Sequence, residues 1–348
     1  MNTKILLLVV GVLLLCIVGM LVRIFFLYSA QKEVPAPEAH LSVSDTNDMQ
    51  QKYSGKKILY IDSYHEGYEW SDGITEGITD VLSKTDVSLQ IHRMDTKRNT
   101  DEAFKIAAAE KAKAAIELYK PDVVLVSDDN AFKYLLEPHY KDSDIPIVFS
   151  GMNWDVSVYD APYSNTTGMV EVSLIRELIG MLREYASGDR VGYLNADVLT
   201  ARKSAGYISK LFEVHFEKEY FVSTMEEWEE AFLALQDEVD VLIFVNNAGI
   251  ADWDDARAET FARAHTKIPV GTVQEWTMQS SLIGLIKIPQ EQGEWSALAA
   301  LQILDGVPVT SIPMVTNQRG SLLVNIKIAD KLNVRIRPDV LKNAEIVE

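Results

Sequence analysis

The side chains best suited to recognising a molecule lie in short polar clusters, each directly after a run of apolar residues. Residues 127–130 (Ser-Asp-Asp-Asn) follow the apolar run 123–126, and residues 150–154 (Ser-Gly-Met-Asn-Trp) follow the run 147–149. Carboxylates, amides and an indole group supply charge, hydrogen bonds and contact area, which are the usual lining of a small-molecule site. The two clusters therefore predict that this part of the chain holds a small molecule.

Similar clusters recur elsewhere in the sequence. They follow apolar runs at residues 57–61, 191–194, 241–245 and 269–273. The candidate ligand-binding residues, taken from all these clusters and from one suspected crossover, are Ser63, Tyr64, His65, Tyr68, Trp70, Asp128, Asp129, Asn130, Gly151, Asn153, Trp154, Glu171, Asn195, Asp197, Asn246, Asn247 and Trp276.

Each candidate also has a structural interpretation that the sequence leaves open. The aromatic residues of 63–70 could pack on their own domain instead of lining a site. Residues 128–130 could only cap the helix predicted at 131–137, although helix N-termini also point at ligands. The polar residues of the second half could be turn or cap residues. Glu171 is a candidate because a charge at a crossover between lobes would face the cleft.

Catalysis is not predicted. His65 is close in sequence to Asp62 and Glu66 and could take part in acid–base chemistry, but no activated nucleophile stands beside it. The acidic residues 252–255 lack the spacing and the glycine of a calcium loop, which favours a solvated helix start. We therefore expect no enzyme, no cofactor and no metal site, with a hydrolase or isomerase as an alternative that turnover of the bound compound would reveal.

The composition excludes some partners and some chemistry. The 348 residues include 51 acidic and 33 basic side chains, a formal net charge of −18. So acidic a balance disfavours nucleic acid, which requires basic patches. The single cysteine, Cys16, rules out an intramolecular disulfide. The length leaves room for two domains of ordinary size.

The N-terminal segment has the length and composition of a membrane span. Residues 5–22 are apolar and carry no charge, which meets the length needed to cross a bilayer. We predict that residues 1–28 are an uncleaved transmembrane anchor, since the candidate cleavage sites are poor; a removed signal segment is the alternative. Residues 29–54 are polar and lack apolar periodicity, which predicts a flexible linker.

Strands and helices are expected to alternate along the rest of the chain. The apolar runs are rich in β-branched residues and predict buried parallel strands with helices between them. Further strands are expected at residues 88–94 and 282–288, and a crossover at 157–168. Helices are expected at residues 71–83, 101–119, 131–137, 172–185, 201–219, 225–238, 253–266 and 291–304. Three of the strand ends with polar clusters precede residue 165 and three follow it, which predicts two doubly wound α/β lobes facing each other across a cleft.

Three stretches resemble a known family. Residues 120–126 with 145–151, residues 189–195 (DRVGYLN) and residues 323–346 are similar to the extracytoplasmic solute-binding proteins of ABC transporters, of the type related to tryptophan and tyrosine uptake systems. The resemblance covers roughly residues 55–348. It implies a type I periplasmic-binding fold, with lobe 1 at about 55–168 plus 284–318 and lobe 2 at about 169–283 plus 319–348.

The resemblance also implies a function. A membrane-tethered, extracytoplasmic protein of a bacterial cell envelope would capture a small polar or aromatic solute between its lobes for an ABC permease. Carboxylates among aromatic residues favour an amine-bearing or aromatic, amino-acid-like solute. Residues 63–71, however, also resemble the opening loop of domains that are fused to bacterial sensor kinases. A ligand-sensing domain that reports to a separate kinase or another membrane partner is therefore the alternative, and no nucleic acid is expected in either case.

Overall fold

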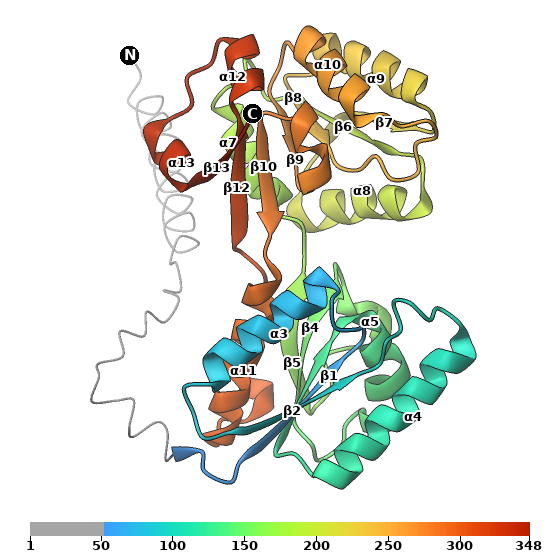
Figure 1. Cartoon of the computed structure of the whole chain (residues 1–348), viewed down its shortest axis with the longest axis vertical. Helices are drawn as coiled ribbons and strands as arrows, with labels where there is room; N and C mark the ends of the chain where they lie inside the picture. The colour runs from blue at the N-terminus through green and yellow to red at the C-terminus, as the bar shows by residue number, and fades with distance from the viewer. Residues whose placement is uncertain (1–51) are drawn as a thin grey trace, which may run out of the picture. The chain divides into compact units, whose positions relative to one another are not determined.

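Two β-sheets, each covered by helices, organise residues 52–348, the part of the chain that the structure describes (Figure 1). The structure is a computed structural model. The first sheet takes its strands from residues 57–171 and from 315–316, and the second from residues 191–287 and 320–347. The predicted fold class of two α/β lobes is therefore confirmed.

The first sheet has six parallel strands in the order β11-β5-β4-β3-β1-β2. Its strands are β1 (Lys57–Asp62), β2 (Ser88–Arg93), β3 (Val123–Ser127), β4 (Ile147–Asn153), β5 (Thr166–Glu171) and β11 (Val315–Thr316). Side chains alternate between its faces, so Ile58 and Tyr60 pack in one apolar layer and Leu59 and Ile61 in the other. Burial on both faces explains why these strands are continuous apolar runs in the sequence.

The second sheet repeats this order of connections and has one strand more, giving β13-β12-β10-β9-β8-β6-β7. Its strands are β6 (Val191–Ala196), β7 (Phe216–Val222), β8 (Val241–Phe244), β9 (Val270–Thr272), β10 (Ile283–Lys287), β12 (Gly320–Asn325) and β13 (Ala344–Val347). β12 runs antiparallel to β10, with Gly320 opposite Lys287. The expectation of purely parallel sheets is thus wrong at this strand, because β12 enters the sheet at the end where β10 leaves it.

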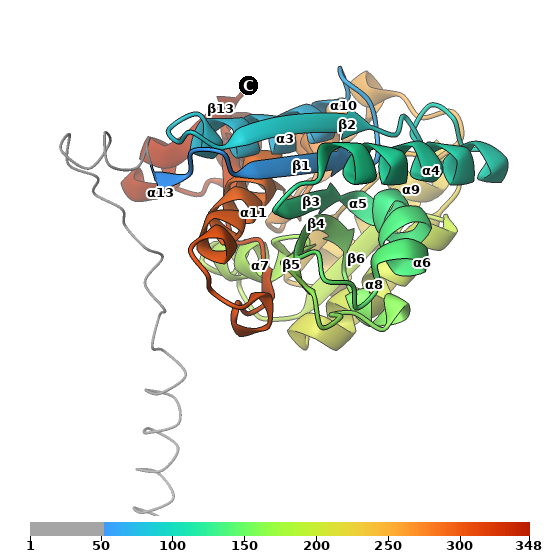
Figure 2. The same cartoon turned by 90° about the horizontal axis from the view of Figure 1, so that it is seen from below.

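The helices alternate with the strands. They are α3 (Glu69–Leu82), α4 (Glu102–Tyr119), α5 (Asp128–Ala131), α6 (Glu137–Tyr140), α7 (Ile175–Arg183), α8 (Leu199–Phe212), α9 (Met225–Glu238), α10 (Asp255–His265), α11 (Pro289–Leu304), α12 (Ile326–Leu332) and α13 (Pro338–Asn343). A π-helical turn, η1 (Phe132–Leu136), joins α5 to α6, and short 3₁₀ turns are η2 (Val156–Tyr159), η3 (Glu275–Ser280) and η4 (Val309–Ser311). In Figure 2, α11 lies on one side of β3 and β4, and α4 and α6 lie on the other.

Two predicted elements are wrong. The helix expected over residues 201–219 ends at Phe212, because Glu213 has a left-handed backbone (φ 55°), and the chain then forms β7. The end of the crossover expected at 157–168 belongs to β5. β7 is an edge strand whose centre is charged and exposed, so the sequence shows no apolar run there.

The chain passes between the two sheets at three places. The links lie after Glu171 at the end of β5, after Lys287 at the end of β10, and after Thr316 at the end of β11. The division predicted from the sequence placed residues 284–318 in lobe 1, whereas β10 pairs within the second sheet. We therefore propose that the lobes divide at these three links.

The described part of the chain begins with residues that the sequence assigns to the linker. Lys52 Nζ donates a hydrogen bond to Asp305 at 2.7 Å, and the Tyr53 hydroxyl donates to the same carboxylate at 3.1 Å. The Tyr53 ring is buried against α11 and its neighbours, which fixes this end of the chain. The predicted anchor at residues 1–28 lies outside the described residues. Between residues 52 and 348, no helix combines the length and apolar character of a membrane span.

Helices α3 and α11 approach each other backbone to backbone. A Cβ atom at Gly77 would overlap the Gln290 carbonyl oxygen, and one at Gly293 would overlap the carbonyl oxygen of Ile74. Because α11 follows the second link between the sheets, this contact attaches the returning chain to the first lobe.

We predict that Gly77→Ala and Gly293→Ala each destabilise the protein by about 1–3 kcal/mol, since the helices must move apart to admit a methyl group. Urea unfolding followed by circular dichroism measures the loss. Gly180→Ala is the matched control: Gly180 lies in α7, an added Cβ meets nothing within 4 Å, and the better helix propensity of alanine stabilises by about 0.5–1 kcal/mol. Equal effects at the three positions would contradict the close packing of α3 and α11.

Candidate functional site

The carboxyl ends of the central strands mark the place where a ligand is expected. In the first sheet, β2 lies on one side of β1 and β3 on the other, so the connections turn away in opposite directions. In open α/β sheets such a switch point leaves a crevice at the carboxyl ends of the strands. The same arrangement recurs at β6, between β7 and β8. The loops after β1 and β3 are therefore the natural starting points for a site.

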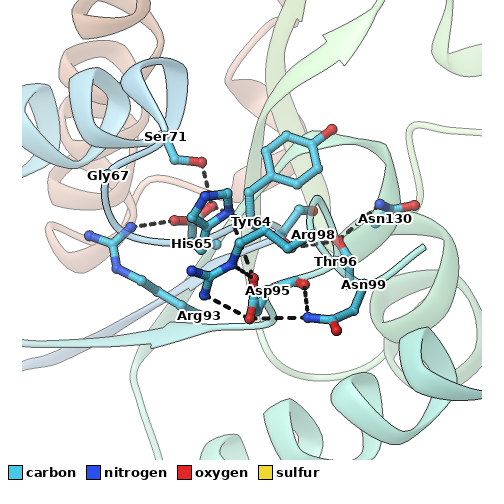
Figure 3. A network of polar contacts seen from close by, with 12 residues as sticks. Tyr64, His65, Gly67, Ser71, Arg93, Asp95, Thr96, Arg98, Asn99 and Asn130 are labelled. Atoms are coloured by element: carbon cyan, nitrogen blue, oxygen red, sulfur yellow. Dashed lines mark hydrogen bonds and ion pairs between the residues drawn. The ribbon is translucent and has the colours of Figure 1, made fainter. Parts of the chain in front are cut away.

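Asp62, the last residue of β1, is fully buried and holds the loop that follows it. Its Oδ2 accepts a hydrogen bond from Arg93 Nη1 at 2.6 Å, and its Oδ1 accepts from Ser71 Oγ and Tyr64 N, both at 2.9 Å. Arg93 ends β2 and Ser71 lies in the first turn of α3, so one carboxylate joins three elements. Figure 3 shows both side chains converging on the loop after β1.

Ser63 is also buried and links the loops after β1 and β3. Its hydroxyl donates to Ser127 O at 2.6 Å and accepts from Ala131 N at 2.7 Å. Its carbonyl oxygen accepts from the Thr96 amide at 3.0 Å. The hydroxyl already donates one hydrogen bond and accepts another, so this candidate residue positions the two loops.

Two tyrosines follow on the same loop. The rings of Tyr64 and Tyr68 form an edge-to-face pair with centroids 5.3 Å apart, and Lys97 Nζ lies 5.0 and 4.8 Å from their centres. His65 stacks on Tyr68 at 5.9 Å. The Tyr64 ring extends away from the polar contacts of its neighbours (Figure 3). Burial, followed by the charge of Asp128, raises the pKa of Tyr64, so its hydroxyl stays protonated and can donate a hydrogen bond.

Asp128, directly after β3, is a buried carboxyl group with one unpaired oxygen. Its Oδ1 accepts from Trp70 Nε1 at 3.2 Å, whereas its Oδ2 has no hydrogen-bond partner among residues 52–348 although only 3% of the residue is exposed. Burial, followed by the charges of Glu171 and Asp62, raises the pKa of Asp128 well above its ordinary value. A carboxyl group this costly to bury is stabilised best by a hydrogen-bond donor or a cation, and residues 52–348 supply neither to Oδ2.

Gly151 in β4 lies against Asp128. A Cβ atom there would lie 2.9 Å from Asp128 Oδ1, and the backbone has a φ of 69°, so both the space and the conformation favour glycine. The Gly151 amide donates to Gln292 Oε1 in α11 at 3.0 Å, and Gln292 Nε2 is buried without a partner in the described part of the chain. Two unsatisfied polar side chains therefore both contact Gly151.

An ion pair joins the first two links between the lobes. Glu171, the last residue of β5, is 6% exposed, and its Oε1 pairs with Nζ of Lys287, the last residue of β10. The Lys287 ammonium also lies 5.2 Å from the centre of the Trp70 ring. Burial raises the pKa of Glu171, and the positive charge of Lys287 opposes that shift. Trp70 thus contacts Asp128 through its N–H and Lys287 through its ring.

The remaining polar candidates of the first lobe form hydrogen bonds within that lobe. Asp129 accepts from Asn153 Nδ2 at 3.1 Å and from the Tyr159 hydroxyl at 3.0 Å. Asn130 donates to Thr96 Oγ1 at 2.9 Å. These contacts hold the loops after β3 and β4 together, and Asn153 remains exposed beside them.

Trp154 contacts the second lobe. Its ring stacks on Tyr207 of α8, with centroids 6.1 Å apart and planes 4° from parallel. The neighbouring Asp155 pairs with Lys210 of the same helix at 3.7 Å. The Trp154 amide donates to Glu171 O at 2.9 Å, which places this contact beside the first link. In this structure the ring is therefore held by the other lobe.

The candidate residues of the second lobe do not form one connected group as those of the first lobe do. Asn195 is buried and donates to the Tyr193 hydroxyl at 2.7 Å, and Asp197 pairs with Arg202 at 2.7 Å. Asn246 Oδ1 accepts from Trp276 Nε1 at 3.2 Å, and the Trp276 side chain is largely exposed. Asn247 is half-buried. The structure brings Asn246 and Trp276 together but leaves Asn195 and Asp197 in local contacts, so their role in binding stays a prediction.

Two residues that the sequence did not single out belong to the site. Lys287 is the one charge in the apolar stretch 282–288 and stands just before Ile288 and Pro289, which was a usable signal. Gln292 offered no such signal in the sequence, because a single amide side chain in a helix is common.

A cavity of about 780 Å³ beside Lys287 is lined by the carboxylates of Glu69, Asp72, Glu76, Glu275 and Glu345, among others. Among the described residues, no three His, Cys, Asp or Glu side chains are grouped as a metal ion requires.

A family model matches most of the chain. The model for ABC transporter substrate-binding proteins covers residues 64–348. A comparison with curated protein sequences finds no match.

Solved structures share the fold at low sequence identity. A ligand-free, open substrate-binding protein with adhesive properties from Clostridium difficile is 18% identical, with a TM-score of 0.63, over 84% of this chain and 99% of that one. A Streptococcus pneumonia ABC domain in complex with L-Trp is 17% identical, with a TM-score of 0.52, over 85% and 100%. A periplasmic ribose ABC transporter protein from Conexibacter woesei is 16% identical, with a TM-score of 0.51, over 81% and 96%. At these identities the likeness shows the fold alone.

The unpaired carboxyl group of Asp128 predicts an unusual dependence of stability on pH. Because its pKa is higher in the folded than in the unfolded protein, its contribution to stability is present below about pH 4 and is lost as the pH rises through the folded-state pKa. Asp128→Asn should therefore stabilise the unliganded protein by about 1–3 kcal/mol at pH 8 and by less at pH 4. Urea unfolding at pH 4, 6 and 8 measures the difference.

Asp62→Asn is the matched control, a buried aspartate at the neighbouring strand end whose oxygens accept three close hydrogen bonds. It should destabilise the protein at pH 8, because Arg93 loses its charged acceptor. A pH-independent effect of Asp128→Asn, or the same sign for both variants, would show that Asp128 is not held in an unsatisfied site.

Proposed function

Because the chain belongs to the family of ABC transporter substrate-binding proteins, we propose that it captures a small polar or aromatic solute between its two lobes and presents that solute to an ABC permease. Proteins of this family bind solutes outside the cytoplasm and do not transform them, so the chain is not an enzyme. The observation that carries the proposed site is the buried, unpaired Oδ2 of Asp128 at the end of β3.

The surroundings of Asp128 support a ligand site at this place. The Trp70 indole and the Tyr64 phenol offer ring faces and protonated donors next to the carboxyl group. Glu171 and Lys287 bring charge from the two links, whose movement would change the distance between the lobes. A solute held by both lobes would favour the closed arrangement, since a ligand shifts such an equilibrium by binding one state better.

The proposed placement in the cell follows from the sequence as well as from the family. Residues 5–22 are uncharged and long enough to cross a bilayer, and we propose that they keep the solute-binding lobes at the outer face of the membrane. A protein tethered in this way could contact either an ABC permease or a separate sensor kinase in the same membrane. Recovery of a permease after crosslinking in cells would support transport, and recovery of a kinase would favour the sensing alternative.

A thermal-shift screen of amino acids, amines, nucleosides and sugars tests for the solute. The solute should compact the protein in small-angle scattering, because closing the lobes lowers the radius of gyration. Trp154→Ala should weaken binding by more than tenfold in calorimetry, since losing the buried area and the stacking of a large ring costs about 1.5 kcal/mol or more and each tenfold is about 1.4 kcal/mol.

Tyr207→Ala is the control for this variant. It removes the stacking partner of Trp154 in the second lobe and leaves the indole free, so the affinity should be retained or improved. Equal losses in the two variants would show that Trp154 acts through the contact between the lobes. Tight binding without compaction would contradict a site shared by both lobes.

Membrane attachment is tested in cells. The full-length protein should stay with the membrane after washing in alkaline carbonate and should retain its first residues, because the predicted span at residues 5–22 lacks a good cleavage site downstream. Mass spectrometry of the N-terminus checks this. A soluble form that begins near Gln31 or Pro37 would show that the segment is a removed signal.

A further inference from the structure

The Lys287 ammonium lies between a buried carboxylate, that of Glu171, and the ring of Trp70. Glu171 is 6% exposed, and it receives its ammonium from Lys287, on the strand that ends at the second link between the lobes. The same ammonium lies over the Trp70 ring, 5.2 Å from its centre. A carboxylate on one side and an indole face on the other are the two groups that proteins use to hold ammonium ions.

The charges around this ammonium leave room for another cation. Asp62 is matched by Arg93 at 2.6 Å, and Glu171 is matched by Lys287. Asp128, whose Oδ1 is bonded to Trp70, has no cation of its own: its Oδ2 lacks a partner within residues 52–348. This buried, unpaired oxygen indicates that Asp128 lacks the positive donor that would stabilise its charge.

We propose that Lys287 acts as a built-in substitute for the amine of the solute, and that the site takes solutes carrying a positively charged amine. This inference rests on the proposed solute-binding function. The solute amine takes the position between Glu171 and Trp70 next to Asp128, and Lys287 moves away from Glu171. No bond is made or broken in this exchange, since one ammonium replaces another at the same carboxylate.

The exchange would connect recognition with movement of the lobes. Glu171 ends β5 and Lys287 ends β10, so their ion pair bridges the first two links between the sheets. When the solute amine replaces Lys287, this bridge is released while Glu171 remains neutralised. A solute without a cationic group could not release it without leaving a buried carboxylate unpaired, which is costly. Lys287 therefore sets the specificity for charge as well as the resting position of the links.

Chemical rescue of the full-length protein tests the cation site without knowledge of the solute. Lys287→Met removes the ammonium and keeps most of the stem, so the melting temperature should fall because Glu171 is left unpaired. Ethylammonium chloride at tens of millimolar should then raise the melting temperature of the variant by about 2 °C or more, as ligands of the folded state do. The double variant Glu171→Gln/Lys287→Met is the matched control and should not respond, because it lacks the carboxylate.

Sodium chloride and sodium propionate at the same ionic strength separate amine binding from general salt effects. Stabilisation of Lys287→Met by ethylammonium alone supports the proposal. Equal stabilisation by the three salts, or an equal response of the double variant, overturns it. If Lys287→Met does not fold, its refolding is compared in ethylammonium and in sodium chloride: recovery only in the amine supports the proposal, and equal or absent recovery overturns it.

The solute-binding function and the cation site are distinguished by separate measurements. A solute screen without any binder, together with a positive rescue, would count against the proposed transport function but leave the cation site in place. A screen that finds only anionic solutes, whose binding is lost in Lys287→Met, would overturn the substitute role and make Lys287 a direct anion ligand.

Discussion

The buried carboxylate of Asp62 is the contact on which the first lobe depends. It joins the end of β1 to Arg93 of β2 and to Ser71 of α3, and it accepts the amide of Tyr64, which sets the course of the loop between them. A buried charge with that many donors is stable only when all of them are present. The Asp62 side chain therefore helps to position the residues that follow β1. These are Tyr64, His65 and Tyr68 on the loop and Trp70 at the start of α3.

Asp128 lies at the end of the adjacent strand, and its environment is the opposite. Asp62 has a cation and two further donors, whereas Asp128 has one indole N–H and an oxygen that nothing in the described residues satisfies. Sites that bind ligands commonly contain groups that the empty protein leaves unsatisfied, because the ligand then supplies the missing contact. The contrast between two buried aspartates on neighbouring strands is a stronger argument for a site than either residue alone. In this comparison the carboxylate of Asp62 holds the fold together, whereas that of Asp128 has an oxygen available to bind a ligand.

Much of the fold could be predicted from the sequence, because doubly wound sheets bury both faces of their strands. The runs at residues 123–126 and 147–149 stand out for that reason, and the helices between them follow from apolar periodicity. The edge strand β7 lacks that burial, and the helix predicted at 201–219 wrongly includes its first residues. The candidate site could be predicted only for residues that follow a strand end in the sequence, such as Trp70 and Asp128. Lys287 and Gln292 lie more than a hundred positions along the chain from their partners. Only the tertiary structure brings Lys287 to Glu171 and Gln292 to Gly151.

The return of α11 to the first lobe has a consequence for how the chain is made. The first sheet cannot be completed when β5 ends at residue 171, because the partner of α3 begins at residue 289 and the edge strand β11 at residue 315. Until those residues emerge, α3 exposes the apolar side chains of Ile74 and Ile78 that α11 later covers. Because the central strands β6 to β10 of the second lobe are continuous in sequence, they are all synthesised before α11 completes the first lobe. A chain interrupted between residues 288 and 316 would lack parts of both lobes: all or part of α11 and the edge strand β11 in the first, and β12 and β13 in the second.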